Sequence, residues 1–328
     1  MKFFRIISSA FLIFTILFTL VFAKDILTLK DENKGVNYQG VITLWQIDAF
    51  EGGKGSRKQF LLDVSRAFEK KNKGVLVMVI SHTIDSASVL IEKGEYPDLI
   101  SYGQGQKVNN LREIPISVQA KEWTKLHDKV YAYPWCRGGY FLIENHNYKQ
   151  KDQKMVVSKQ RLTIPLLSAY LEEIEVGEFE SKNSMDAYVD FVSGKYKFLL
   201  GTQRDVWRIN SRGFDAKCTP ITNYSDLYQY VSVTTKSDTK YELCLRFIEH
   251  LLSETEQKNL HKIGMLSAYY KVDNDISALN NLNDVNPKYS LSPYLSEVLI
   301  NEASKYSIDA LSGDEDAQIK LKKILIKS

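Results

Sequence analysis

VITLWQID (residues 41–48) opens the stretch that decides the fold, and two further apolar runs follow it, VLVMVISH (75–82) and PDLISYG (97–103). Between the first two runs, the apolar residues of RKQFLLDVSRAFEKKN (57–72) are spaced for one face of a helix. A second helix is predicted over roughly 84–93, between the second and third runs. The three runs are almost continuously apolar, which is typical of strands covered on both faces of a parallel sheet. Strands that alternate with helices in this way predict an α/β fold.

Polar and aromatic side chains gather where these strands end. Open parallel sheets bind ligands just beyond the carboxyl ends of their strands. The residues at or near those ends are Trp45, Gln46, Asp48, His82, Tyr102 and Gln104. The sequence therefore predicts the place of a ligand before it predicts its chemistry.

Three later segments are predicted to be extended chain that crosses between two lobes: 129–145, 227–235 and 265–272. Three crossings tie the lobes by a hinge, which favours closure on a ligand in the gap. The region 104–130 is expected to be helical, and so is the C-terminal tail. The predicted first lobe combines residues 24–133 with 234–268, and the predicted second lobe combines residues 134–233 with 269–328.

The first 23 residues form a separate segment. Lys2 and Arg5 give a basic start, Ile6–Phe22 is almost wholly apolar, and Ala23 offers a small residue before a cleavage point at Lys24. This pattern predicts an export signal, and an uncleaved membrane anchor over 6–22 is the alternative. The formal charge of +3 loses the charges of Lys2 and Arg5 on cleavage, which leaves +1. A near-neutral chain argues against a nucleic-acid partner.

No pattern of catalytic or metal-binding residues is found. The histidines lack metal-ligand spacing, and Cys136 lacks the surroundings of a catalytic nucleophile. Cys136, Cys218 and Cys244 are too few for a disulfide framework, and they are expected to pack as thiols, although one bridge stays open. We therefore expect no enzyme activity, no metal and no cofactor.

Four quoted segments carry a family resemblance. ITLWQIDAFEGGKGSRKQFLLDVSRAFEKKNKGVLVMVIS with YPDLISYG (42–103) resembles the N-terminal part of extracellular solute-binding proteins of the carbohydrate ABC transporter class. YAYPWCRGGYFLIEN (131–145), AYVDFVSGKYKFLLGTQRDVW (187–207) and FIEHLLSETEQKNLHKIGMLSAYY (247–270) match in the same order. The chain departs from the family in lacking a cysteine for lipidation after the signal, and in being shorter around 146–183.

The resemblance implies a type II periplasmic-binding fold: two hinged α/β lobes with a ligand cleft between them and a helical C-terminal tail. It also implies docking of the loaded protein to an ABC transporter permease at the membrane, without catalysis. The expected partner is a small polar solute, most simply a carbohydrate, and the expected protein is a monomer outside the cytoplasm. A membrane-tethered solute sensor is the alternative function, and turnover of a solute would indicate a hydrolase.

The predicted ligand contacts come from both lobes. Aromatic faces and a few fixed polar groups suit a concave small-molecule site. Gly201 to Asp205 forms a strand-to-helix turn whose N–H groups favour an oxygen-rich ligand, and Arg204 can bind paired acceptors. The predicted contacts are Trp45, Asp48, Tyr102, Gln104, Trp135, Thr202, Gln203 and Arg204. The competing interpretations are a core tryptophan for Trp45, solvated loop residues for Asp48 and Gln104, and a structural Arg204–Asp205 arrangement with Trp207 in the core.

Overall fold

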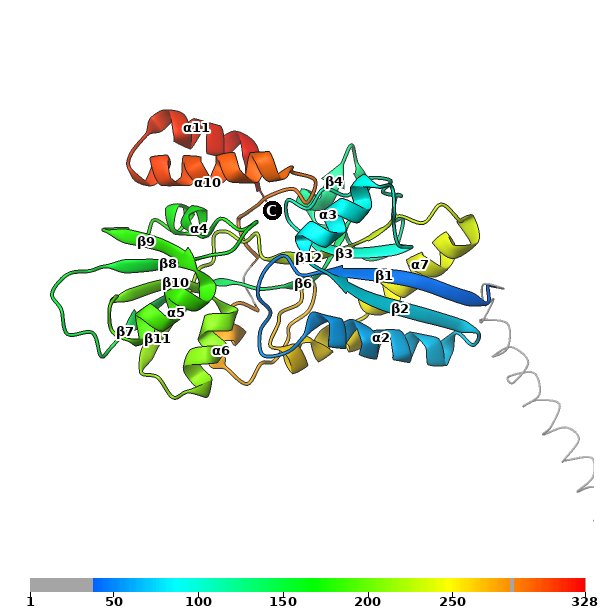
Figure 1. Cartoon of the computed structure of the whole chain (residues 1–328), viewed down its shortest axis with the longest axis horizontal. Helices are drawn as coiled ribbons and strands as arrows, with labels where there is room; N and C mark the ends of the chain where they lie inside the picture. Colours follow the sequence, from blue (N-terminus) through cyan, green and yellow to red (C-terminus); the bar gives the residue numbers. More distant parts are fainter. Residues whose placement is uncertain (1–37, 284–285, 328) are drawn as a thin grey trace, which may run out of the picture. The chain divides into compact units, whose positions relative to one another are not determined.

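The protein, studied as a computed structural model, is described over residues 38–283 and 286–327. The predicted export signal and anchor, residues 1–23, lie outside the described residues. Within residues 38–283 and 286–327, no helix combines the length and the apolar character that a membrane span requires. The fold is mixed α/β and contains two large sheets, each with its own helices (Figure 1). We call them the first and second lobes.

The first lobe is built on a sheet with the strand order β2-β1-β3-β12-β6. Strands β1, β2 and β3 are parallel, as predicted, and β12 runs antiparallel to both β3 and β6. The bounds are β1 Gly40–Ile47, β2 Val75–His82, β3 Leu99–Gly103, β6 Tyr133–Arg137 and β12 Tyr228–Val233.

The second lobe is built on a sheet with the strand order β11-β7-β10-β8-β9. Strands β8, β9 and β10 are parallel, whereas β7 pairs antiparallel with β10 and β11. The bounds are β7 Tyr140–Asn145, β8 Met155–Lys159, β9 Phe179–Asn183, β10 Phe198–Thr202 and β11 Ala216–Pro220.

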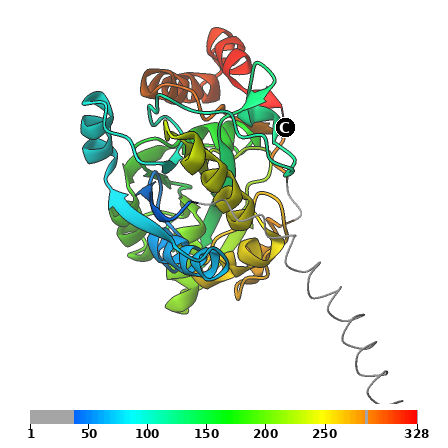
Figure 2. The same cartoon turned by 90° about the vertical axis from the view of Figure 1, so that its right-hand side faces the viewer.

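Helices pack against both sheets. Helix α2 lies along β2 and contacts α7, and α5 and α6 contact the second sheet (Figure 1). Helices α10 and α11 lie side by side, and α10 contacts α4 (Figures 1 and 2). The bounds are α2 Arg57–Lys71, α3 Ile84–Glu92, α4 Pro165–Leu171, α5 Ser184–Val192, α6 Gln203–Ser211, α7 Asp238–Leu251, α8 Glu254–Lys258, α9 Ser277–Asn280, α10 Glu297–Leu311 and α11 Glu315–Ile324.

Short elements complete the described chain. They are η1 Glu122–Thr124, β4 Lys125–Leu126, β5 Lys129–Val130, η2 Asn259–Ile263, β13 Tyr289–Ser290 and β14 Ile326–Lys327. The helix expected within 104–130 was wrong, because this region is irregular apart from η1 and the β4–β5 pair. Its polar residues carry no apolar face that would hold a helix against the sheet.

Local sequence explains why α2 forms where it does. The Ser56 side chain caps the helix by accepting a hydrogen bond from the N–H of Gln59. Phe60, Leu61 and Phe68 fall on the buried face, as their helical spacing predicted. Helix α2 therefore begins directly after the glycine-rich segment that follows β1, and this fixes both ends of that segment.

Sheet membership differs from the expected lobe boundaries at two strands. Strands β6 and β12 belong to the first sheet, although the predicted boundaries at 133/134 and 233/234 assigned most of β6 and all of β12 to the second lobe. The chain passes from β6 to β7 through Gly138 and Gly139 alone. A Cβ on Gly138 would lie 2.3 Å from Oε1 of Gln203, so a larger residue here would displace the amide that accepts from the N–H of Gly139.

Candidate functional site

A loop of residues 48–56, which we call the 48–56 loop, leaves the carboxyl end of β1 and reaches the second lobe. It contacts η2 on the way, and a Cβ on Gly53 would lie 2.1 Å from the carbonyl oxygen of Gly264. The N–H of Gly55 donates to the carbonyl of Ile263 at 3.2 Å. The glycines thus permit a backbone approach that no larger residue would allow.

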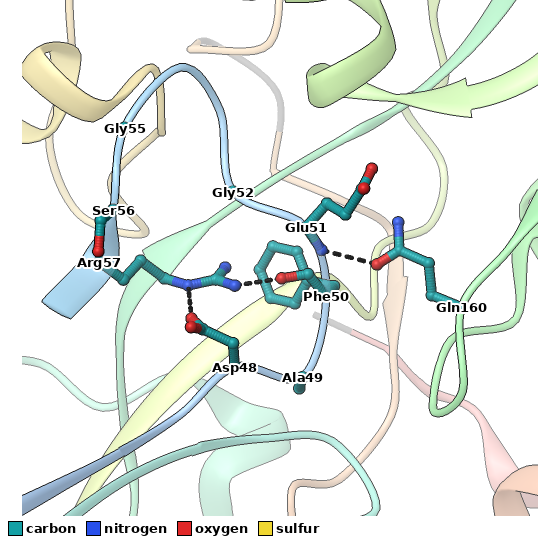
Figure 3. A pocket seen from close by; sticks show the side chains of 9 residues that line it. All are labelled: Asp48, Ala49, Phe50, Glu51, Gly52, Gly55, Ser56, Arg57 and Gln160. Carbon is teal, nitrogen blue, oxygen red and sulfur yellow. Dashed lines mark hydrogen bonds and ion pairs between the residues drawn. The ribbon is translucent and has the colours of Figure 1, made fainter. Parts of the chain in front are cut away.

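The 48–56 loop and the first residue of helix α2 line an open pocket of about 450 Å³ (Figure 3). Gln160, which follows β8 of the second lobe, closes one side of it. The lining residues are Asp48, Ala49, Phe50, Glu51, Gly52, Gly55, Ser56, Arg57 and Gln160. The pocket therefore combines residues of both lobes at the end of a parallel strand, where open sheets place their ligands.

Arg57 is the first residue of α2, and its side chain lies inside the curve of the 48–56 loop (Figure 3). Only 3% of its surface is exposed. Its Nε donates to Asp48 at 2.7 Å, its Nη2 donates to the carbonyl of Phe50, and its guanidinium lies 4.4 Å from the Phe50 ring centroid. A cation at the first position of a helix is unfavourable to the helix dipole, and the Asp48 carboxylate offsets this. Nη1 has no hydrogen-bond partner among the described residues.

Glu51 joins the loop to the second lobe. Its N–H donates to Oε1 of Gln160 at 2.7 Å, and its carbonyl accepts from Nε2 of Gln203 at 2.7 Å. Its carboxylate accepts from both terminal nitrogens of Arg208, at 2.9 and 3.1 Å, and from the hydroxyl of Ser184. A bidentate guanidinium–carboxylate pair fixes geometry as well as charge.

The second-lobe end of this network is held by the start of α6. The Thr202 side chain and the Asp205 carboxylate form a capping box, and Asp205 also accepts from Arg208 at 3.1 Å. Burial raises the pKa of Asp205 to about 6, although the N–H of Thr202 and the charge of Arg208 favour the ionised form. Asp205 thus orients Arg208 from a fully buried position.

The raised pKa of Asp205 predicts a pH-dependent stability. Because the folded protein holds this proton more tightly than the unfolded chain, with its value of 3.8, the contribution of Asp205 falls as pH rises from about 4 to about 6. The isosteric Asp205→Asn variant lacks this titration. We expect the wild-type free energy of unfolding, minus that of the variant, to fall by up to about 3 kcal/mol over this range. Urea titrations at pH 4, 5, 6 and 7 measure it, and a constant difference would contradict the prediction.

Four of the predicted contacts lie at the interface between the lobes. Asp48 lines the pocket, and 55% of its side-chain surface is exposed. Gln203 and Arg204 bind the 48–56 loop, Arg204 through the carbonyl of Gly53, and Thr202 caps α6. The structure therefore brings these residues together, but uses the second-lobe side chains to hold the loop.

Tyr102 and Trp135 lie in the interior of the first lobe and not at a cleft wall. Tyr102 is 1% exposed, and its hydroxyl bonds the Ser232 hydroxyl at 3.1 Å. Trp135 has no exposed surface and stacks on Phe60 with 5.5 Å between ring centroids. Both residues lie on strands of the first sheet, Tyr102 on β3 and Trp135 on β6, and both are buried in the interior of this lobe.

Trp45 and Gln104 are also buried. Trp45 is 7% exposed and lies in the apolar cluster of the first lobe, with its ring 4.6 Å from that of His82. Gln104 is 1% exposed and donates to the carbonyl of Ser292. Neither residue lines the pocket beside the 48–56 loop. The three cysteines are free thiols, and Cys136 and Cys244 are buried, as expected.

Sequence reasoning missed Glu51, Arg57, Gln160, Ser184 and Arg208. Only Glu51 and Arg57 carried a signal, because they flank the glycine-rich turn that follows β1. Gln160, Ser184 and Arg208 lie more than a hundred residues from Glu51 in sequence. No local pattern indicates such pairing.

The sequence matches no protein-family model and no curated protein sequence. Solved structures do match. The maltose/maltodextrin-binding domain MalE of Bdellovibrio bacteriovorus, bound to maltotriose, aligns with a TM-score of 0.54 at 13% identity over 87% of this chain and 99% of that one. This chain has the fold of such binding proteins.

Two more matches support the same fold. The GacH receptor of Streptomyces glaucescens, whose structures include a complex with acarbose, aligns with a TM-score of 0.56 at 13% identity over 88% of this chain and 98% of that one. The maltose-maltodextrin binding protein of Alicyclobacillus acidocaldarius aligns with a TM-score of 0.55 at 13% identity over 87% and 98% of the two chains. Two of the three are described as maltose- and maltodextrin-binding, and the third as a receptor.

Proposed function

We propose that the protein is an extracytoplasmic solute-binding protein that captures a small carbohydrate and delivers it to an ABC importer. The observation that carries the proposal is the pocket of both lobes beside the 48–56 loop, in a fold whose solved neighbours are described as bound to maltotriose or acarbose. Export, the permease partner and a monomeric state are parts of the same proposal.

The pocket has the groups that a sugar requires. Phe50 contributes a largely buried ring to the lining, the exposed Asp48 carboxylate can accept hydrogen bonds from hydroxyls, and Nε2 of Gln160 has no partner among the described residues. A ligand that contacts the loop and Gln160 together would stabilise the arrangement in which the lobes meet. We propose Asp48 and Gln160 as direct contacts, with Gln203 and Arg204 acting through the loop.

A thermal-shift screen of the purified protein tests the function. The panel contains glucose, maltose, maltotriose, amino acids and inorganic anions. A ligand that binds only the folded state adds about 2.7 kcal/mol at 100 times its Kd, enough to raise Tm by several degrees. We expect a shift with at least one sugar and no turnover of it. A shift with amino acids alone would overturn the carbohydrate assignment, and hydrolysis of the sugar would overturn the binding-protein assignment.

Replacement of Gln160 by alanine tests the site itself. The variant loses one hydrogen bond to the solute, worth about 0.5–1.5 kcal/mol, so affinity should fall by a few-fold to tenfold. Isothermal titration calorimetry with the sugar found in the screen measures the change. Gln150→Ala, at an exposed position, is the matched control and should bind as the wild type does. Equal affinities for all three proteins would place the solute elsewhere.

A further inference from the structure

The second lobe holds Glu51 as a binding site holds a ligand. Every polar atom of this residue, the N–H, the carbonyl oxygen and both carboxylate oxygens, is hydrogen-bonded to a second-lobe side chain. These partners come from three separate places: Gln160 after β8, Ser184 at the start of α5, and Gln203 and Arg208 on α6. We call these four residues the acid-binding face.

Residues of the second lobe itself, and not only the 48–56 loop, orient the acid-binding face. Asp205, with no exposed surface, holds Arg208 at 3.1 Å, and the N–H of Gly139 donates to Oε1 of Gln203 at 3.0 Å. Gln203 therefore presents its Nε2 to the loop, and Arg208 presents both terminal nitrogens. Side chains whose geometry is fixed by their own lobe bind an incoming group at low entropic cost.

The chemistry of the face selects a carboxylate. Arg208 offers a planar pair of donors with 11% of its side chain exposed, whereas Glu51 keeps 33% of its side chain exposed. Arg204, four residues before Arg208 on α6, adds a second cation to this helix and binds the carbonyl of Gly53 in the same loop. Among the described residues, the acidic side chains that contact Arg208 are those of Glu51 and Asp205, and Asp205 contacts only Nη1. A solute that carries a carboxylate and a neighbouring oxygen or nitrogen atom can accept hydrogen bonds from these donors as Glu51 does.

We propose that the acid-binding face is a solute site for the carboxylate of an acidic sugar, and that Glu51 occupies it as an internal competitor. This inference rests on the proposed function and narrows its substrate class to sugars that carry a carboxylate, such as hexuronates. The solute acid displaces the Glu51 carboxylate from Arg208 and Ser184, while the backbone contacts of Glu51 with Gln160 and Gln203 remain. The loop thereby lowers the apparent affinity, because only the displaced fraction of the protein is competent to bind.

The competition is tested by calorimetric titration of the wild type and of Glu51→Ala with sodium glucuronate, glucose and maltotriose at constant ionic strength. Removal of the competitor should tighten glucuronate binding by on the order of tenfold or more. Equal glucuronate affinity in the two proteins, or no glucuronate binding by either, would overturn the inference. Maltotriose binding by the wild type would then still uphold the proposed function, so the two failures are distinguishable.

Two further variants separate competition from a loss of structure. Arg208→Ala introduced into Glu51→Ala should abolish the gain in glucuronate affinity, because the main donor is gone. Glu175→Ala, which removes an exposed carboxylate of the second lobe, is the matched control and should bind as the wild type does. If Glu51→Ala does not fold, Glu51→Gln keeps the size of the side chain and should tighten glucuronate binding in the same direction. A gain that survives without Arg208 would overturn the assignment of the face.

Discussion

Replacement of Trp135 by alanine is expected to lower the free energy of unfolding by about 3–5 kcal/mol, the cost of removing a large aromatic side chain from a packed interior. Trp135 has no exposed surface, its ring stacks on Phe60 at an interplanar angle of 9°, and its Nε1 donates to the Ser101 hydroxyl at 2.9 Å. Urea unfolding followed by far-UV circular dichroism measures the loss.

The Trp135→Phe variant separates packing from hydrogen bonding. It keeps a ring against Phe60 but loses the donor to Ser101, so it should cost less than the alanine variant. Solute affinity should be unchanged in the phenylalanine variant, because Trp135 lies in the first-lobe interior. A Trp135→Ala protein with wild-type stability and no solute binding would instead support the prediction from sequence that Trp135 contacts the ligand.

The second large effect is expected at Gly103, in the middle of the first sheet. A Cβ at this position would lie 2.0 Å from Cβ of Ala49, and 3.5 Å from the carbonyl oxygen of Tyr228. Strand β3 is held on both sides, by β1 and β12, so it cannot easily move away. Overpacking of this kind costs typically 1–3 kcal/mol, and we expect Gly103→Ala to lose about 3 kcal/mol.

A double-mutant cycle makes the cause explicit. Ala49→Gly removes the methyl group that Gly103→Ala meets, so the combined protein should recover most of the lost stability. Gly177→Ala is the matched control, because its Cβ would meet no atom within 4 Å and its φ is ordinary, and it should leave stability unchanged within about 0.5 kcal/mol. Additive effects of the two substitutions would show that the Ala49 contact is not the source of the loss.

The parts of the fold that were predictable are those that local sequence encodes. The apolar runs and the helical periodicity of 41–103 predicted β1, α2, β2, α3 and β3, because both leave direct traces in the residues. The expected burial on both faces was wrong for β2, which lies at the edge of the sheet and exposes Leu76 and Met78. The glycine-rich turn predicted where the loop after β1 would lie. The start of α6 was also predicted, from the strand-to-helix turn expected over Gly201 to Asp205.

The site was less predictable, for a physical reason. A tryptophan or tyrosine near a strand end looks the same in sequence whether it faces a cleft or the interior, and Tyr102 and Trp135 face the interior. The partners of Glu51 are set by how the second lobe folds, and not by residues close to Glu51 in the chain. The placement of β12 was missed for the same reason, because pairing with β3 and β6 depends on strands about a hundred residues away or more.

The position of β12 constrains when the protein can fold during synthesis. This strand fills the place between β3 and β6, so the sheet cannot be completed until residue 233 has been made. The strands of the second sheet, by contrast, fall within one continuous stretch from Tyr140 to Pro220 and can assemble earlier. A nascent chain that ends before residue 228 therefore holds β3 and β6 without the strand that joins them. Such a chain exposes unpaired strand edges, the kind of aggregation-prone state that chaperones bind.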